Sequence, residues 1–397
     1  MLLLSQLKND FSFSALVAGF VAVLVGFASA IAIVFQAAKT AGADQAMLES
    51  WVWALGIGMG LSSMGLSLWY KRPLIIAWST PGAALIAATS IELTMAQAVG
   101  VFLFVGLMIL LTGVSGLFSR LSKAIPSPIA SAMLAGILLN FGIHLFTALR
   151  SEVLLVGVML LTYIVARMFV PRLAIAFVLF VAIVMVLMTG QLELSSVSIT
   201  FSKPVFVIPE FSLSLLIGLG IPLFLVTMSS QNLPGVAVLK ASGYSAQNIS
   251  PVISVTGIST LLLSPFGGFT FNLAAITAAI CTSEEAHENI EQRYIAGVSA
   301  GIFNLLTGVF ASAVVGIFVA FPEELVLALA GLALIGVIGN SLKMATEIKQ
   351  HQDAAILTFL VCASGVSFWE ISSAFWGLVL GMTVVVSHKL FTRLKRS

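Results

Sequence analysis

The stretch that decides the fold reads Pro73-Leu-Ile-Ile-Ala-Trp-Ser-Thr-Pro81-Gly-Ala-Ala-Leu-Ile-Ala-Ala88. It is apolar enough to lie within a membrane, but Pro81 prevents one continuous helix, because proline removes a backbone donor and clashes with the preceding turn. We therefore expect Leu74 to Ser79 to be extended, with Thr80 as N-cap and Pro81 opening a short helix from Gly82 onward. Unwound backbone at bilayer depth is tolerated only where protein buries it or where it lines a wet cavity. This break therefore predicts half of a substrate site.

Composition places the rest of the chain in a lipid bilayer. Of 397 residues, 59% are hydrophobic and only 9% are charged, and the mean hydropathy is +1.13. A soluble protein of this length carries far more charge. Apolar runs long enough to cross a bilayer recur throughout, which indicates a polytopic membrane protein. The net charge of +2 comes from scattered basic residues, so we expect no nucleic-acid partner.

We expect an all-α polytopic membrane protein with fourteen spans, the third and tenth being half extended and half helical. The apolar run 11–35 is too long for a signal-peptide core and is the first span. The segment 190–210 is expected to be an extended connector. The expected spans are 11–35, 51–70, 73–90, 95–119, 126–147, 152–168, 173–189, 211–234, 249–264, 265–282, 293–320, 325–342, 353–367 and 371–388.

The basic residues orient these spans. Fifteen Lys and Arg residues fall on the side of the two termini, and three (Lys39, Arg150 and Lys203) fall on the opposite side. Cytoplasmic loops carry an excess of basic residues, so both termini are expected in the cytoplasm. The sequence therefore predicts a multi-pass protein of the bacterial inner membrane.

An internal repeat divides the chain into residues 1–190 and 191–397. Phe11-Ser-Phe-Ser14 opens the first span and Phe211-Ser-Leu-Ser214 opens the eighth. The stretch from Thr80 to Ala88 is echoed by Thr270-Phe-Asn-Leu-Ala-Ala-Ile-Thr-Ala278. Two copies of seven spans must run in opposite directions, because seven is odd. The sequence therefore predicts a seven-plus-seven inverted repeat, which is typical of secondary transporters.

The second copy contains a matching break. Pro265, Gly267 and Gly268 oppose helix formation, so we expect extended backbone to about Phe271. A short helix should then run to about Cys281, with Thr270 or Asn272 as its cap. Opposite span directions bring both helix N-termini to the midplane, facing each other. Their free N–H groups and positive dipole ends are expected to attract an anion, particularly a carboxylate.

Candidate ligand-binding residues follow from this geometry. Gln231 and Asn232 end the eighth span, and polar side chains at membrane depth usually face the protein interior. The alternative role of Gln231 and Asn232 is interhelical hydrogen bonding. The alternative role of the aromatic candidates is packing in the core. The primary candidates are Ser79, Thr80, Gly82, Ala83, Gln231, Asn232, Phe269, Thr270, Phe271 and Asn272; the secondary ones are Ser29, Trp78, Gly267 and Gly268.

Other chemistries lack a signature. The four histidines are dispersed without metal-ligand spacing, so we expect no metal site. A phosphate-binding loop is absent from the sequence, which argues against ATP-driven pumping, and we expect no cofactor. All sixteen acidic residues fall in loops or near span ends, so the expected site contains no carboxylate that could carry a proton. No nucleophile–base constellation lies within the expected spans, so an enzyme is not expected.

Four motifs resemble the bacterial benzoate:proton symporter family of the BenE type, and the resemblance covers essentially the whole chain. They are Ala77-Trp-Ser-Thr-Pro-Gly-Ala-Ala-Leu85, Ser229-Ser-Gln-Asn-Leu-Pro-Gly235, Ser264-Pro-Phe-Gly267 and Ala274-Ala-Ile-Thr-Ala-Ala-Ile-Cys-Thr-Ser-Glu-Glu-Ala-His287. That family is similar to the nucleobase/ascorbate and sulfate/bicarbonate transporters. The resemblance implies fourteen spans, a core domain of about 11–122 plus 211–320, and a gate domain of about 123–190 plus 321–391. Related folds often form dimers through the gate domain, so a homodimer is a candidate assembly.

The resemblance also implies that substrate binds between the third and tenth spans and that the core moves against the gate. Nucleobase carriers place a Glu on the eighth span and another on the tenth, whereas the matching region here offers Gln231 and Asn272. A neutral site suits a substrate that brings its own negative charge, but it leaves the proton route unexplained.

The leading hypothesis is a proton-coupled secondary importer of benzoate or a similar aromatic carboxylate. The alternatives are a carrier or a channel for another small organic or inorganic anion. A channel would use the same half-helix dipoles without alternating access.

Overall fold

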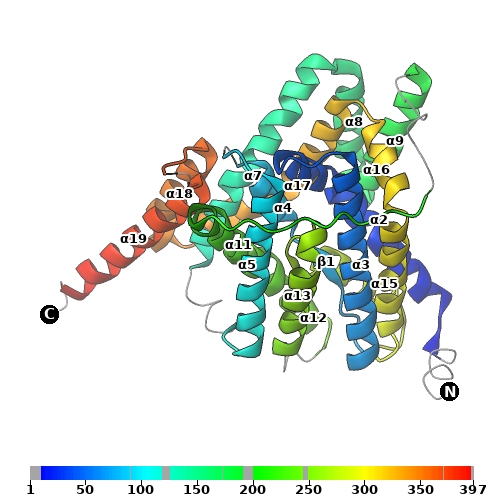
Figure 1. Cartoon of the computed structure of the whole chain (residues 1–397), viewed down its shortest axis with the longest axis horizontal. Helices are drawn as coiled ribbons and strands as arrows, with labels where there is room; N and C mark the ends of the chain where they lie inside the picture. The colour runs from blue at the N-terminus through cyan, green and yellow to red at the C-terminus, as the bar shows by residue number, and fades with distance from the viewer. Residues whose placement is uncertain are drawn as a thin grey trace.

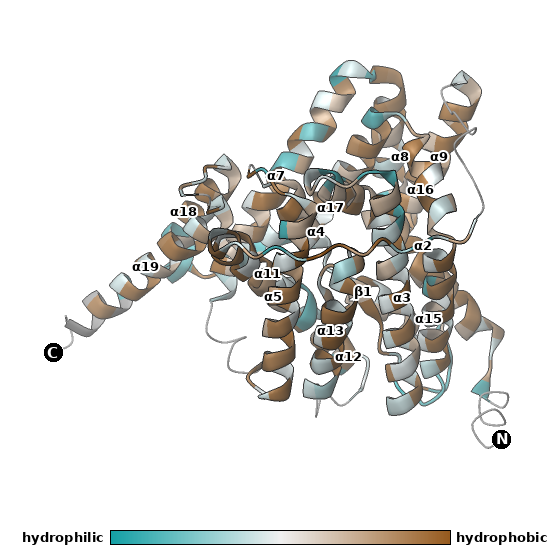
Figure 2. Cartoon of the chain, viewed as in Figure 1, coloured by the Kyte–Doolittle hydropathy of each residue, from teal (hydrophilic) through white to brown (hydrophobic). Residues whose placement is uncertain are grey.

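The structure is a computed structural model that describes residues 10–89, 91–118, 126–171, 173–190, 200–244, 249–369 and 371–394. Helices make up most of it, and α2 begins and α19 ends at opposite ends of its long axis (Figure 1). Apolar residues dominate the helices throughout (Figure 2). A helical fold with apolar surfaces is what a polytopic membrane protein requires.

The described residues of the first half form two long helices, a short strand with a short helix, and four further helices. They are α2 (Phe13–Thr40), α3 (Gln45–Tyr70), β1 (Ile76–Trp78), α4 (Thr80–Ala87), α5 (Met95–Val114), α7 (Ser127–Ser151), α8 (Val153–Phe169) and α9 (Ala174–Thr189).

The first helix described after the connector is the long helix Leu213–Ala241, which contains two π-helical turns. Its parts are α10 (Leu213–Leu215), η2 (Leu216–Gly220), α11 (Ile221–Thr227), η3 (Met228–Asn232) and α12 (Leu233–Ala241). The elements that follow are α13 (Ser250–Leu263), η4 (Ser264–Phe266), β2 (Phe271–Leu273), α14 (Ile276–Thr282), α15 (Tyr294–Val309), α16 (Ala311–Val319), α17 (Glu323–Thr346), η5 (Lys349–His351), α18 (Gln352–Ser364) and α19 (Ser373–Leu394).

Within the described residues, six helices are long and apolar enough to cross a membrane by themselves. A seventh span results if α15 and α16 are taken together, but they bend by 67°. The span expected over 293–320 is therefore bent, and its course across the membrane stays a prediction. The bend falls at Phe310, between the two helices, where the backbone leaves helical angles.

Both expected breaks are present, and they pair with each other. β1 and β2 form a two-stranded antiparallel sheet with Ile76 opposite Leu273, Ala77 opposite Asn272 and Trp78 opposite Phe271. Two further backbone bonds extend the pairing, from Ser79 N to Thr270 O at 3.1 Å and from Ala274 N to Ile75 O at 2.9 Å. Each extended segment thus satisfies the backbone groups of the other, which is what allows non-helical backbone inside a membrane protein.

The caps of both short helices differ from the expectation. Ser79, and not Thr80, is the N-cap of α4, and its Oγ accepts a hydrogen bond from Gly82 N at 3.1 Å. Thr80 is the first helical residue and Pro81 the second. α14 begins at Ile276 rather than near Asn272, and its N-cap is Ala275, so neither Thr270 nor Asn272 caps it. Pairing with β1 holds Asn272 in extended backbone, and this tertiary contact overrides the local capping signal.

The helices pack in two sets that small residues bring close together. In the first set, α3 packs against α15, α5 packs against α13, and α2 packs against α15 and α4. In the second set, α7 packs against α17 and α18, α18 packs against α19, and α8 packs against α9. A Cβ on Gly56 of α3 would lie 2.5 Å from the Gly308 Cα of α15, so only glycine permits this approach. Small residues at helix contacts are typical of membrane proteins, where packing replaces the hydrophobic effect as the driving force.

Residues 200–210 of the expected connector are not helical and cross one face of the molecule toward α10 (Figure 1). Backbone bonds hold it in place: Ser202 N donates to Val309 O, Val207 N to Pro265 O and Glu210 N to Ala96 O, at 2.8 to 3.1 Å. The extended connector is confirmed here; residues 191–199 lie outside the described part of the chain.

Candidate functional site

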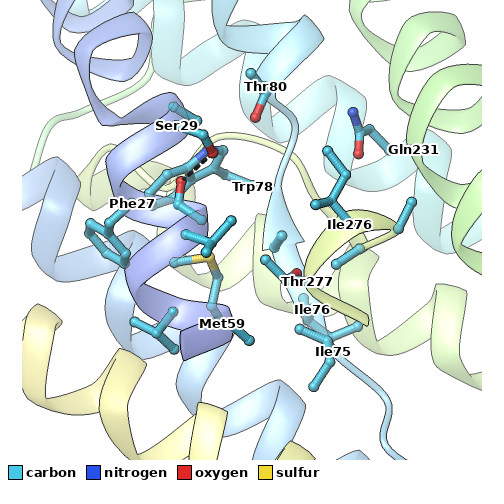
Figure 3. A pocket seen from close by; sticks show the side chains of 18 of the residues that line it. Phe27, Ser29, Met59, Ile75, Ile76, Trp78, Thr80, Gln231, Ile276 and Thr277 are labelled. Atoms are coloured by element: carbon cyan, nitrogen blue, oxygen red, sulfur yellow. Dashed lines mark hydrogen bonds between the residues drawn. The ribbon is translucent and has the colours of Figure 1, made fainter. Parts of the chain in front are cut away.

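A cavity of about 280 Å³ lies beside the crossing of the two broken segments. Its wall comes from α2, α3, β1, the start of α4, η3, the start of α12, the start of α14, α15 and α17. In Figure 3, Thr80 and Gln231 lie toward one end, and Met59 and Ile75 toward the other. A cavity of this size is small, and its wall is mainly apolar with a few polar side chains, as small-molecule sites usually are.

The α4 end of the cavity offers fewer free donors than a generic helix start. Pro81 has no N–H, Gly82 N donates to Ser79 Oγ, and Ala83 N donates to Ser79 O at 2.8 Å. Among the described residues, the N–H of Thr80 has no hydrogen-bond partner. The Thr80 side chain lines the cavity, whereas Ser79 is fully buried and accepts a further bond from Thr227 Oγ1 at 3.0 Å. Ser79 therefore holds the helix start in place rather than forming the cavity wall.

Gln231 reaches the cavity from the π-helical turn η3. A π turn widens the helix by one residue and is frequent at functional sites. Among the described residues, the Gln231 amide has no hydrogen-bond partner, and it lies near Thr80 in the view of Figure 3. A primary amide that faces a cavity in this state is free to bind a ligand through both its oxygen and its nitrogen.

Asn232, one residue further, has a structural role. It is fully buried, and its Oδ1 accepts a hydrogen bond from Leu273 N of β2 at 3.0 Å. Its Nδ2 faces Thr227 O at 3.5 Å and Met228 Sδ at 3.3 Å. Asn232 thus links the π turn to the sheet and does not line the cavity.

The aromatic part of the wall is formed by Trp78 and Phe27. Their rings meet edge to face, with centroids 4.8 Å apart and an interplanar angle of 77°. Met59 of α3 lines the cavity beside them, and Ser29 does so with its Oγ bonded to Gly26 O at 3.2 Å. This part of the wall can contact the faces and edges of a small aromatic ring.

The aromatic candidates Phe269, before β2, and Phe271, on β2, lie behind this wall. Phe269 is fully buried against Trp51 and Phe102, with ring centroids 5.6 and 6.1 Å away. Phe271 is fully buried and points to α3, where a Cβ on Gly58 would lie 2.3 Å from its ring. Both residues serve the core of the fold.

Thr270 and Asn272 are also fully buried and do not line the cavity. Among the described residues, neither the Thr270 hydroxyl nor either polar atom of the Asn272 side chain has a hydrogen-bond partner. Gly267 and Gly268 make the turn before β2: Gly267 has a φ of +93°, and a Cβ there would lie 1.7 Å from the Trp51 ring. Their role here is close packing.

Of the expected ligand residues, the cavity wall therefore contains Thr80, Gln231, Ser29 and Trp78. The others lie behind the wall: Ser79, Gly82, Ala83, Asn232, Phe269, Thr270, Phe271, Asn272, Gly267 and Gly268. Ligand contact by any of them stays a prediction.

The sequence reasoning missed several wall positions. At α14, the wall consists of Ala274 to Thr277 because the helix starts later than expected, and Thr277 faces Gly26 of α2. Asn304 of α15 and Asn340 of α17 also line the cavity, although neither is among the candidates from the sequence. α17 adds Ala333, Leu334 and Val337, which no sequence motif distinguishes from other apolar residues.

Among the described residues, the cavity wall contains no ionisable side chain, and apart from the indole N–H of Trp78 its polar side chains are hydroxyls and amides. They are Ser29, Thr80, Ser230, Gln231, Thr277, Asn304 and Asn340. Within the described residues, no three His, Cys, Asp or Glu side chains are grouped so that they could hold a metal ion.

Residues 9–387 match the family model described as benzoate membrane transport protein, BenE. The inner membrane protein YdcO of Escherichia coli is 47% identical over 366 residues, which cover 92% of this chain and 93% of that protein. The benzoate membrane transport protein of Acinetobacter baylyi is 40% identical over 380 residues, which cover 96% of each.

Two solved structures share the fold. The transmembrane domain of the cyanobacterial bicarbonate transporter BicA aligns with a TM-score of 0.56 at 14% identity, covering 93% of this chain and 97% of that one. The murine Slc26a9 anion transporter in its inward-facing state gives a TM-score of 0.61 at 14% identity, covering 98% and 71%. At this identity the likeness shows the fold alone, which is that of a membrane transporter.

Proposed function

Because this chain belongs to the BenE family of benzoate membrane transport proteins, we propose that it imports benzoate or a similar aromatic carboxylate together with protons. The protein is a multi-pass membrane transporter of the bacterial inner membrane and not an enzyme. The substrate and the coupling to protons are the proposed part.

The observation that carries this proposal is the cavity at the crossing of the two broken segments. One side of it is apolar and aromatic, with Trp78 and Phe27. The Gln231 amide and the Thr80 hydroxyl supply polar groups. A substrate with one ring and one carboxyl group matches this division, because the ring replaces water against apolar atoms while the carboxyl group keeps hydrogen-bond partners.

The proposed architecture has fourteen spans in a seven-plus-seven inverted repeat, with both termini in the cytoplasm. The core domain comprises about 11–122 and 211–320, and the gate domain about 123–190 and 321–391. The two packing sets support this division: helices of the proposed core pack mainly with one another, as do those of the proposed gate. The antiparallel pairing of β1 with β2 fits segments that enter the membrane from opposite sides.

Transport in this scheme is a movement of the core against the gate. The cavity wall combines residues of α2, β1 and α14 with residues of α17, so it lies where the two proposed domains meet. Substrate bound to the core would be exposed to one side of the membrane and then to the other as α17 shifts relative to it.

The test is uptake of labelled benzoate into proteoliposomes under an imposed inward pH gradient. Proton symport predicts faster uptake than in a protonophore control, because the gradient then drives the cycle. Equal uptake with and without the gradient would contradict the coupling. Saturable counterflow of labelled benzoate against unlabelled benzoate distinguishes the carrier from a channel.

A further inference from the structure

Except for Trp78, whose indole N–H only donates, the polar side chains of the described cavity wall can both donate and accept hydrogen bonds. A carboxylate can only accept, whereas a neutral carboxylic acid donates through its O–H and accepts at its carbonyl oxygen. A site built for a free carboxylate typically supplies Arg, Lys or several backbone N–H groups. Here the wall has no cation. At α4, three of the first four residues offer no free N–H, because Pro81 has none and those of Gly82 and Ala83 bond to Ser79. The start of α14 also lines the cavity and has no side-chain cap, so its first N–H groups are the remaining backbone donors of the described wall.

The Gln231 amide is the complement of a neutral carboxyl group. Its Oε1 can accept the acid O–H while its Nε2 donates to the acid carbonyl, so two parallel hydrogen bonds form. Gln231 faces the cavity, and its amide has no hydrogen-bond partner among the described residues. A carboxylate in the same place would leave the Gln231 oxygen without a donor and facing a negative charge.

We propose that the substrate is bound and carried as the neutral acid, with the transported proton on its own carboxyl group and the Gln231 amide as its partner. This inference rests on the proposed function. The proton balance is simple: a proton from the outer solution forms an O–H bond with the carboxylate on binding, and the same bond breaks on release inside. One proton and one anion cross together, so the cycle moves no net charge and needs no ionisable residue in the site.

The ionisable groups near Gln231 do not offer another place for the proton. Of the described elements that pack against η3, α7 carries His144 and Arg150 and α12 carries Lys240; all three are exposed, and none lines the cavity. The other wall-forming helices carry ionisable residues that are likewise absent from the wall: Lys39, Glu49, Tyr70, Cys281, Tyr294, Glu323, Glu324 and Lys343. The apolar surroundings also favour the neutral form, because burial raises the pKa of a carboxyl group.

The first experiment measures benzoate binding to the purified full-length protein by calorimetry between pH 5.5 and 7.5. A free carboxyl group has a pKa of about 4, so binding of the neutral acid should weaken the apparent affinity about tenfold per pH unit. Uptake of about one proton per benzoate bound should accompany it. Saturable benzoate binding with constant affinity and no proton uptake would overturn the neutral-acid proposal while leaving benzoate transport intact. An absence of benzoate binding at every pH would overturn both proposals.

Two benzoate analogues distinguish a proton on the substrate from a proton on the protein. Benzamide has the same shape and replaces the acid O–H with an N–H donor, so it should compete with benzoate with an affinity independent of pH. Benzenesulfonate keeps its negative charge throughout this range and should bind at least a hundredfold more weakly than benzoate at pH 5.5. Tight binding of benzenesulfonate with proton uptake, and no binding of benzamide, would place the proton on the protein and overturn the proposal.

Gln231→Leu keeps the approximate size of the side chain and removes both hydrogen bonds. It should weaken benzamide and benzoate binding by about ten- to a hundredfold, since each bond contributes about 1 kcal/mol. The matched control is Gln45→Leu at the exposed start of α3, which does not line the cavity and should leave both affinities unchanged. Equal affinities in the two variants, with unchanged melting temperatures, would exclude Gln231 as the partner.

An imposed membrane potential should leave pH-driven uptake by the wild type unchanged.

Discussion

Asn232 and Asn272 are both fully buried, yet among the described residues only Asn232 has partners for its amide group. Asn232 supplies the acceptor for Leu273 N, so it joins the long helix of the second half to β2. Asn272 sits opposite Ala77 in the sheet with both amide atoms unpaired. The same side chain therefore stabilises the fold at one position and carries a desolvation cost at the other.

This difference predicts unequal effects of the same substitution. Asn232→Ala leaves Leu273 N–H buried without an acceptor and should lower the free energy of unfolding by about 1–3 kcal/mol. Asn272→Ala removes two unpaired polar atoms and should cost less. The measurement is the melting temperature of each variant in the same detergent. A larger drop for Asn272→Ala than for Asn232→Ala would contradict this reading of the two amides.

Trp78 provides a second residue-scale prediction, which concerns the ring of the substrate. Trp78→Leu keeps an apolar side chain on β1 but removes the aromatic surface that packs on Phe27 and faces the cavity. Aromatic pairs contribute about 0.5–1.5 kcal/mol beyond the burial of area, so benzoate binding should weaken about three- to tenfold or more. The matched control is Trp69→Leu, because Trp69 is 82% exposed on α3. Calorimetry on both variants decides, and equal affinities would remove Trp78 from the site.

At the scale of elements, proline and glycine made the two breaks predictable, whereas their pairing was not. Pro81 and the Pro265–Gly268 turn act on their own backbone, so local rules located both interruptions. The register of β1 with β2 depends on contact between segments that lie far apart in the sequence, and no local pattern encodes it. For this reason α14 begins at Ile276 and not near Asn272 as predicted. The cavity wall accordingly contains Ala274 to Thr277 in place of the predicted residues.

Gly82 shows how the structure changes the reason for a prediction. The sequence predicts Gly82 as a ligand-binding residue. In the structure, a Cβ would lie 2.7 Å from Leu223 Cδ1 of α11 and 2.8 Å from the Ser79 cap. The position therefore requires glycine for packing between α4 and α11.

We accordingly predict that Gly82→Ala destabilises the protein by about 1–3 kcal/mol, as overpacking does. The matched control is Gly65→Ala on α3, where no heavy atom lies within 4 Å of the added Cβ. That substitution should leave stability unchanged or raise it by up to ~1 kcal/mol, since alanine favours helices over glycine. Thermal unfolding of both variants is the measurement, and an equal response of the two would contradict the packing argument.

At the scale of the whole molecule, the cavity belongs to neither set of packed helices alone. α2, β1 and α14 form much of its wall, and α17, which packs on α7, closes it. The contribution of α17 could not be predicted from the sequence, because Ala333, Leu334 and Val337 differ in no local way from apolar residues that face lipid. Only the arrangement of the two sets makes them part of a site.

This shared wall yields a prediction for Val337→Trp. The larger ring should fill the cavity from the α17 side, so benzoate uptake should fall at least tenfold and binding should weaken in parallel. The contact of α17 with α7 includes Gly331 against Leu145 and Ile338 beside Gly142, whereas Val337 lines the cavity, so the fold should persist. Leu342→Trp is the matched control, because Leu342 is 39% exposed on the same helix and does not line the cavity.

Benzoate uptake into proteoliposomes and the melting temperature are measured for both α17 variants. Loss of uptake in Val337→Trp alone, with both proteins melting near the wild-type temperature, is the outcome that a substrate path between the two helix sets requires. Normal uptake by Val337→Trp would mean that benzoate crosses without occupying the space beside α17. The path would then lie within one set of helices, and movement of core against gate would lose its structural basis.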